Sequence, residues 1–168
     1  MYPQQWGVIG IALLLLVVVV GGGCSDDGSD SPTSPLAAST NVTGVWNFAG
    51  QLVRNSCELD ALSPISGNIS LNQSGLTVST GRVDLIVERG SSWYFYYAGT
   101  VTGNNVNMSA TDPYVLRDGG TVIHFGSGID IQNIQNNVGS GSLNITGQCI
   151  QGCTGSCQTI WSGTWTKL

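Results

Sequence analysis

The sequence has 168 residues and a formal net charge of −5, and only 9% of its residues are charged. From residue 41 onward, seven acidic side chains are balanced by five basic ones, so the chain offers no basic surface. This excludes nucleic acid as a partner, because phosphate backbones are bound by clustered lysines and arginines. Glycine is abundant, with 24 residues. Together with many Ser, Thr and Asn residues, it favours strands and tight turns over helices.

The first feature along the chain is an apolar run, residues 8–20, which is followed by Gly21-Gly22-Gly23-Cys24-Ser25. The run has the length of a signal-peptide core and is shorter than the roughly 20 residues of a membrane-spanning helix. Small residues followed by a lone cysteine resemble a bacterial lipoprotein signal. The resemblance implies a signal peptide over residues 1–23 that begins as a helix and is removed. It also implies a diacylglycerol on the Cys24 thiol and an acyl chain such as palmitate on the new amino terminus.

Two or more acyl chains anchor a protein stably to a membrane. We therefore expect a lipid-anchored protein of the bacterial cell envelope, whose domain lies outside the cytoplasm. The outer membrane is favoured if the host has one, because Ser25 follows the lipidated cysteine. An uncleaved membrane anchor and simple secretion are the alternatives. Residues 24–40 are rich in Ser, Asp, Gly and Pro, which predicts a flexible linker to a single domain over residues 41–168.

Four cysteines remain in the domain if Cys24 is lipidated: Cys57, Cys149, Cys153 and Cys157. An even number in an oxidising compartment predicts two disulfides, for which three pairings are possible. A bridge from Cys57 to Cys153 or Cys157 is preferred, because the first and last strands of a closed barrel are neighbours. The spacing fits neither a zinc site nor an iron–sulfur site, so we expect no metal and no cofactor.

Alternation of apolar and polar residues recurs along the domain and predicts short strands throughout. Gly103-Asn104-Asn105 is a strong hairpin signal between two of them. We expect an all-β fold of eight or nine strands, formed as a single antiparallel up-and-down barrel, with a β-sandwich as the alternative. The predicted strands cover residues 43–53, 65–72, 76–79, 83–87, 93–101, 106–110, 121–131, 138–146 and 158–167.

The first predicted strand opens with Thr43-Gly44-Val45-Trp46. A Gly-x-Trp at this place resembles the signature of the lipocalins and their calycin relatives. The resemblance implies that Trp46 plugs one end of the barrel and packs against a basic side chain, either Lys167 or Arg117. Thr111-Asp112 stands where lipocalins carry a Thr-Asp motif.

The last predicted strand places Trp161, Gly163 and Trp165 on one face. If the first and last strands pair, we expect Trp46 and Trp165 to be cross-strand neighbours that close the barrel with an aromatic contact.

The run from Trp93 to Tyr97 is the most aromatic segment of the domain. Alternation places Trp93, Phe95 and Tyr97 on one face, and these three are the candidate ligand-binding residues. An aromatic wall with a hydroxyl tip suits a small, partly apolar ligand.

Nothing in the sequence predicts catalysis. His124 is the single histidine, and it has no placed nucleophile or carboxylate partner. We therefore expect a non-catalytic module that binds a small apolar molecule or an envelope lipid. The alternative is a structural or protein-interaction module with a packed interior. Four small inward residues, Gly50, Gly67, Gly99 and Gly163, either leave a void for a ligand or make room for the tryptophans.

Overall fold

The computed structural model describes residues 39–59, 61–88 and 91–168. Three quarters of these residues (75%) are in strands and none is in a helix, so the predicted all-β fold is confirmed. There are eleven strands in the described residues, more than the eight or nine expected. They are β1 (Gly44–Asn55), β2 (Ile65–Ser74), β3 (Thr77–Thr80), β4 (Val83–Glu88), β5 (Ser91–Phe95), β6 (Tyr97–Thr102), β7 (Asn105–Ala110), β8 (Tyr114–Asp118), β9 (Thr121–Gln135), β10 (Val138–Gln151) and β11 (Ser156–Lys167).

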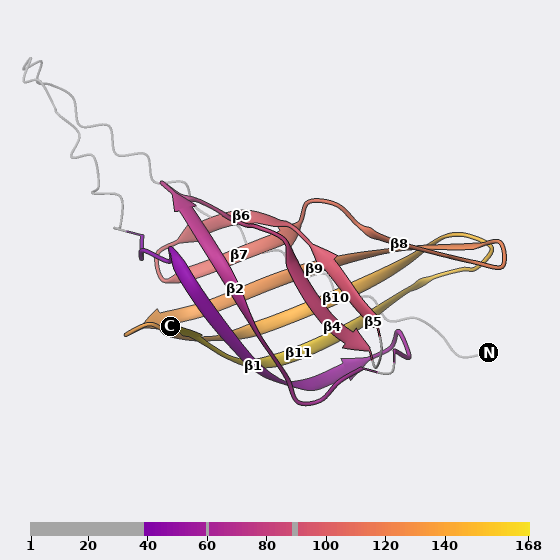
Figure 1. Ribbon diagram of the computed structural model, residues 1–168, viewed down its shortest axis with the longest axis horizontal. Helices are drawn as coiled ribbons and strands as arrows, with labels where there is room; N and C mark the ends of the chain where they lie inside the picture. Colours follow the sequence, from indigo (N-terminus) through magenta and orange to yellow (C-terminus); the bar gives the residue numbers. More distant parts are fainter. Residues whose placement is uncertain (1–38, 60, 89–90) are drawn as a thin grey trace, which may run out of the picture. The chain divides into compact units, whose positions relative to one another are not determined.

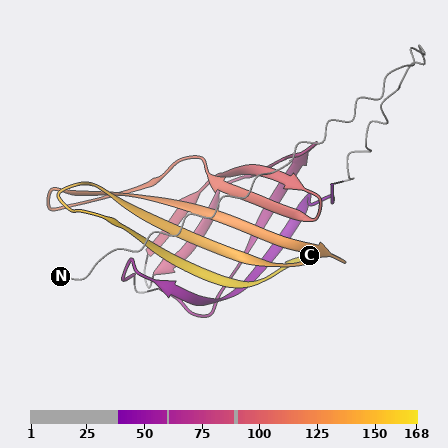
Figure 2. The same cartoon turned by 180° about the vertical axis from the view of Figure 1, so that it is seen from behind.

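Nine of these strands form one antiparallel sheet that closes into a ring (Figure 1). The order around the ring is β10-β11-β1-β2-β3-β6-β7-β9, and β9 pairs again with β10 to complete it. The ninth strand, β8, pairs with the first residues of β9, while β7 pairs with residues farther along the same strand. Seen from behind, β9, β10 and β11 run side by side in orange and yellow (Figure 2). Ring closure leaves few exposed sheet edges, which are sites of aggregation.

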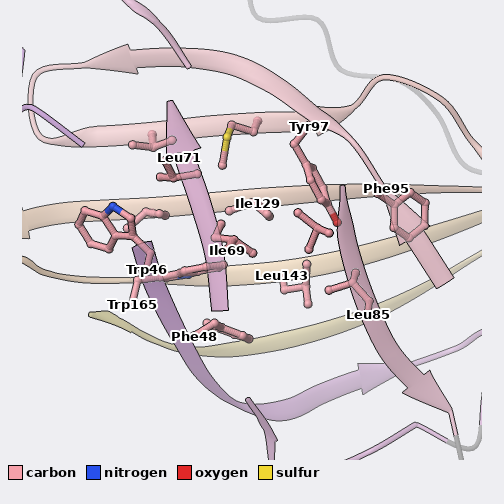
Figure 3. Close-up of a cluster of buried hydrophobic side chains, with 14 of the residues drawn as sticks. Trp46, Phe48, Ile69, Leu71, Leu85, Phe95, Tyr97, Ile129, Leu143 and Trp165 are labelled. Carbon is pink, nitrogen blue, oxygen red and sulfur yellow. The ribbon is translucent and has the colours of Figure 1, made fainter. Parts of the chain in front are cut away.

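Most of the ring interior is occupied by buried apolar side chains that alternate along the strands, as the sequence pattern predicted. Trp46 and Phe48 on β1, and Trp161 and Trp165 on β11, are all less than 5% exposed. Figure 3 shows how side chains from β1, β2, β9, β10 and β11 converge in this core. Burial of each large apolar side chain contributes about 1.5–3 kcal/mol, so the core dominates the stability of the ring.

The first and last strands pair as expected, but their register differs from the expected aromatic contact. Trp165 lies opposite Phe48, and Trp46 lies opposite Lys167. Trp46 and Trp165 are therefore diagonal neighbours rather than direct partners. The Phe48 and Trp165 rings are stacked, with centroids 4.5 Å apart. The aromatic contact between the two strands is thus made by Phe48, because side-chain period alone does not determine cross-strand register.

The predicted strand over residues 93–101 is interrupted at Tyr96 and becomes β5 and β6. On the partner side of the hairpin, the chain breaks in the same way between β3 and β4. Val78 pairs with Gly99 in the ring, whereas Val83 pairs with Phe95 in a separate two-stranded sheet. One long hairpin is therefore divided by a bend, and its far half, β4–β5, leaves the ring.

Two disulfides are present, as predicted from the cysteine count. Cys57 is bonded to Cys157, which joins the end of β1 to the beginning of β11 across 100 residues of sequence. Cys149 is bonded to Cys153 at the turn between β10 and β11. The longer bridge secures the same pair of strands that closes the ring.

The predicted signal peptide, its cleavage before Cys24 and the lipidation site itself lie outside the described residues, as does most of the linker. Within the described residues, no helix has the length and apolar character needed to cross a membrane.

Candidate functional site

The wall of the ring is interrupted between β2 and β4. β2 pairs with β1 along residues 65–71, but its pairing with β3 begins only at Leu71. β4 pairs with β5 and with no other strand of the described residues. The first half of β2 and the facing strand β4 are therefore not joined by a backbone ladder. Only side chains border the space between them.

A cavity of about 410 Å³ opens at this interruption. Its sides are formed by Ile65 and Ile69 of β2 and by Val83 and Leu85 of β4. Figure 3 shows Ile69 and Leu85 on either side of Ile129 and Leu143. The deeper part is lined by apolar side chains from the rest of the ring, namely Phe48, Ile129, Leu143 and Trp165.

Two glycines on neighbouring strands explain why there is room. Phe48 and its partner on β2, Gly67, share the inward face. The Phe48 ring lies over Gly50, where a Cβ atom would collide with it. A Cβ added at Gly67, in contrast, would meet no atom within 4 Å. Of the four small inward residues, Gly67 is the one that lines the cavity.

Apart from the indole of Trp165, the polar side chains of the lining are exposed and lie at the mouth of the cavity. Ser66, Asn68 and Asp84 contribute there, and Asp84 is the only ionisable side chain among the described residues of the lining. Arg82 forms an ion pair with Asp84, with 2.7 Å between Nη2 and Oδ1, and its guanidinium lies over the Tyr94 ring. The hydrogen bond to Asp84 raises the pKa of Arg82. Both charged side chains are more than half exposed, so the pair is solvated and weak.

No family model, curated protein or solved structure matches this chain. We therefore infer function from the geometry of the cavity. In the described residues, no group of three or more His, Cys, Asp or Glu side chains is arranged to hold a metal ion.

The three aromatic residues predicted as ligand-binding are inward and buried, but none of them lines this cavity. Trp93 stacks on Tyr114 of β8 at 4.8 Å and contacts Phe125 of β9 at 4.6 Å, both measured between ring centroids. These contacts attach the β4–β5 hairpin to the ring without backbone hydrogen bonds.

Tyr97 lies deeper, and its hydroxyl group is hydrogen-bonded to Ser127 Oγ at 2.8 Å. Ser127 in turn donates to the backbone oxygen of Asn144 at 2.7 Å. Burial raises the pKa of the Tyr97 hydroxyl, and the hydrogen bond to Ser127 opposes that shift in part. This tyrosine therefore stays neutral and connects β6, β9 and β10 through a buried polar chain.

Phe95 borders a second recess of about 480 Å³, between β5 and β8. Tyr94 and Tyr96 form its outer rim and are 50% and 44% exposed. Asp112 of the Thr111-Asp112 pair also lies in this recess. Unlike the cavity between β2 and β4, it has no lining from the opposite wall of the ring. Its lining comes only from β5, β8 and the residues next to these strands.

The Gly-x-Trp segment, Gly44 to Trp46, forms the beginning of β1. The indole Nε1 of Trp46 donates to the backbone oxygen of Val42 at 2.8 Å, and the side chain is fully buried. Lys167, its partner in the ladder, lies against Gly44, and its Nζ donates to the Asn41 backbone oxygen at 3.3 Å. Arg117, the other expected basic partner, pairs with β9 instead.

Sequence reasoning identified most cavity residues as core residues but did not identify the cavity. Ile65, Ile69, Val83 and Leu85 followed the alternation and read as ordinary strand interior. The one local signal was Gly67, a small residue between large inward neighbours.

Proposed function

We propose that this chain is a membrane-tethered lipoprotein of the cell envelope whose closed ring is a lipocalin-like barrel that binds a small apolar ligand or lipid without catalysis. The observation that carries the proposal is the cavity between β2 and β4. Its volume, about 410 Å³, lies within the range of roughly 300–1,000 Å³ typical of small-molecule sites. Its inner lining is apolar, and each methylene group transferred there from water contributes about 0.8 kcal/mol.

The chemistry of the lining supports binding rather than catalysis. Ser66 places a hydroxyl group at the mouth of the cavity, but the described lining contains no histidine that could activate it. Asp84, the one carboxylate, is engaged by Arg82. A site of this composition holds a guest by exclusion of water and shape, with little means to move a proton.

The membrane is the proposed partner through lipid on Cys24. A lipid-tethered barrel with a lateral opening is suited to take up an apolar molecule close to the bilayer in which such molecules dissolve. We expect Cys24→Ser to move the protein from the membrane fraction to the soluble fraction. If Cys24→Ser stays in the membrane fraction, the protein has an uncleaved anchor. If the natural protein and Cys24→Ser are both soluble, the protein is simply secreted.

The test of the binding function uses the full chain, isolated in its oxidised form from the envelope of its own host. We expect organic extraction followed by mass spectrometry to recover a molecule in stoichiometric amount. Gly67→Trp fills the space above Gly67 and should abolish its recovery. Ser70→Trp, on the same strand but outside the cavity, is the matched control and should retain it. Equal recovery from the two variants would contradict the assignment of this cavity.

A second function is favoured by one separate observation. Tyr94 and Tyr96 are exposed beside the recess between β5 and β8, and exposed aromatic side chains are typical of protein interfaces. If the isolated chain yields no bound molecule, the function is that of a structural or interaction module of the envelope. Tyr94→Ser together with Tyr96→Ser would then remove the interaction, whereas Gly67→Trp would not.

A further inference from the structure

The tryptophans on the first and last strands differ in how their indole N–H groups are satisfied. Trp46 Nε1 donates to the Val42 backbone oxygen, and Trp161 Nε1 donates to the Leu62 backbone oxygen, each at 2.8 Å. Trp165 Nε1 is fully buried and has no hydrogen-bond partner among the described residues. Buried donors are nearly always paired in native proteins, so an unpaired one points to a missing acceptor.

This unpaired donor belongs to a residue of the cavity. Trp165 lines it, although only 1% of the residue is exposed to solvent. Phe48 covers one face of the indole, and the other described residues at this depth, Ile129 and Leu143, are apolar. A water molecule needs two to four polar partners, which such a lining does not offer. Because the N–H itself is buried, a guest reaches it only when the apolar side chains around it move aside. An organic guest that is apolar elsewhere and carries one acceptor atom then satisfies the donor without further polar partners.

The lining limits which acceptor is suitable. Its only ionisable side chain in the described residues, Asp84, is acidic and is paired with Arg82, so no positive side chain of the lining is available to a charged acceptor. A carboxylate in the guest would lose its hydration at depth, with a single N–H in return. A neutral carbonyl oxygen avoids this cost.

We propose that the guest of this cavity is an uncharged, mostly apolar molecule whose carbonyl oxygen, as in a long-chain ketone or ester, accepts a hydrogen bond from Trp165 Nε1. This inference rests on the proposed binding function and specifies its ligand class. Trp165 is then the residue that selects among apolar molecules, and Gly67 and Phe48 provide the space.

The test compares three probes of equal chain length, 2-nonanone, nonane and nonanoate, on the full chain in lipid nanodiscs, with empty nanodiscs as the blank. Isoleucine methyl signals in NMR report occupancy, because Ile65, Ile69 and Ile129 line the cavity. The ¹⁵N indole signal of Trp165, identified by its loss in Trp165→Phe, reports the hydrogen bond. We expect 2-nonanone to bind about 10-fold more tightly than the other two probes and to shift that indole signal downfield.

Trp165→Phe should lower the affinity for 2-nonanone to the level of the affinity for nonane, and the affinity for nonane itself should not change. Trp46→Phe, which removes an indole that lies outside the cavity together with its acceptor Val42, should change neither affinity. Equal binding of ketone and alkane, or ketone binding without a shift of the Trp165 signal, would overturn the ligand class and leave the binding function intact. No response of the isoleucine signals to any probe would overturn both. If Trp165→Phe fails to fold, the indole signal of Trp165 is assigned on the unchanged protein by triple-resonance NMR, and its shift with 2-nonanone still tests the hydrogen bond.

Discussion

Phe48 and Trp165 stack at 4.5 Å between ring centroids, at the place where the first strand of the ring meets the last. The same two rings form part of the inner lining of the cavity. One aromatic contact therefore contributes both to ring closure and to the shape of the proposed binding site. Stability and ligand capacity are coupled at this point, which makes several outcomes predictable.

Phe48→Ala should lower the free energy of unfolding by about 3–5 kcal/mol, because it removes a buried ring and an aromatic pair. Urea unfolding monitored by circular dichroism measures the change. Leu76→Ala is the control, since Leu76 is 51% exposed in a turn and its loss should stay within about 0.5 kcal/mol. A loss at Phe48 no larger than at Leu76 would mean that the stacked pair does not support ring closure.

Gly50→Ala and Gly67→Ala should differ in their effect on stability, although both glycines are inward residues next to Phe48. A methyl group at position 50 enters the space of the Phe48 ring, and overpacking of this kind costs about 1–3 kcal/mol. A methyl group at position 67 meets no atom within 4 Å and should change stability by less than about 0.5 kcal/mol. Denaturant midpoints of the two variants provide the comparison, and equal midpoints would show that the cavity is not as open as described.

The two disulfides should contribute unequally. Cys57→Ala with Cys157→Ala opens a loop of 100 residues, whose closure entropy is worth about 4.7 kcal/mol. Cys149→Ala with Cys153→Ala opens a loop of four residues, worth roughly 2 kcal/mol by the same relation. In thermal unfolding, the midpoint temperature of the Cys57/Cys157 double variant should therefore lie well below that of the Cys149/Cys153 double variant. The reverse order would indicate that the β10–β11 turn, rather than ring closure, limits stability.

Tyr97→Phe should change how stability depends on alkaline pH. The folded state raises the pKa of Tyr97 above its ordinary value of 10.0, so only the unfolded chain ionises just above pH 10. Its contribution to stability is fully present below pH 10 and is lost as pH rises further, by up to about 1.4 kcal/mol per pH unit. Tyr97→Phe has no hydroxyl group to ionise at this position, so its stability should not show this loss.

Near pH 8 the same variant should be about 1 kcal/mol less stable than the natural protein, because the hydrogen bond to Ser127 is missing. That deficit should shrink above pH 10 in urea unfolding measured across the pH range. A deficit that stays constant up to pH 11 would mean that Tyr97 is not protected from ionisation in the folded state.

Local residue patterns were sufficient to predict much of the ring. Alternation placed Val83 and Leu85 on one face of their strand, and placed Trp93 and Phe95 on the face opposite Tyr94. The structure shows that the faces of Val83, Leu85, Trp93 and Phe95 are the buried ones. Gly103 and Asn104 form the turn of the β6–β7 hairpin that their residue types indicated. Each of these features depends on neighbours within a few residues, because the period of a strand and the chemistry of a turn are local properties.

Other elements were not readable from local patterns. The residues on both sides of Tyr96, from Trp93 to Tyr97, all have high strand propensity, and nothing among them predicts the break at Tyr96. Conversely, β8 follows Pro113 and includes Arg117 and Asp118, which do not favour a strand. It is a strand because β9 is long enough to pair with both β7 and β8. Tertiary pairing overrides propensity in both cases.

The sequence was thus enough to establish the all-β class, the inward faces of the strands and the presence of two disulfides. The tertiary structure alone decided that Phe48 rather than Trp46 faces Trp165, and that β2 and β4 diverge and leave a cavity at Gly67. Side-chain period shows which face a residue occupies, but it contains no information on which residue of a distant strand lies opposite. Phe48 and Trp165 are far apart in the chain, so their register is a property of the closed ring as a whole.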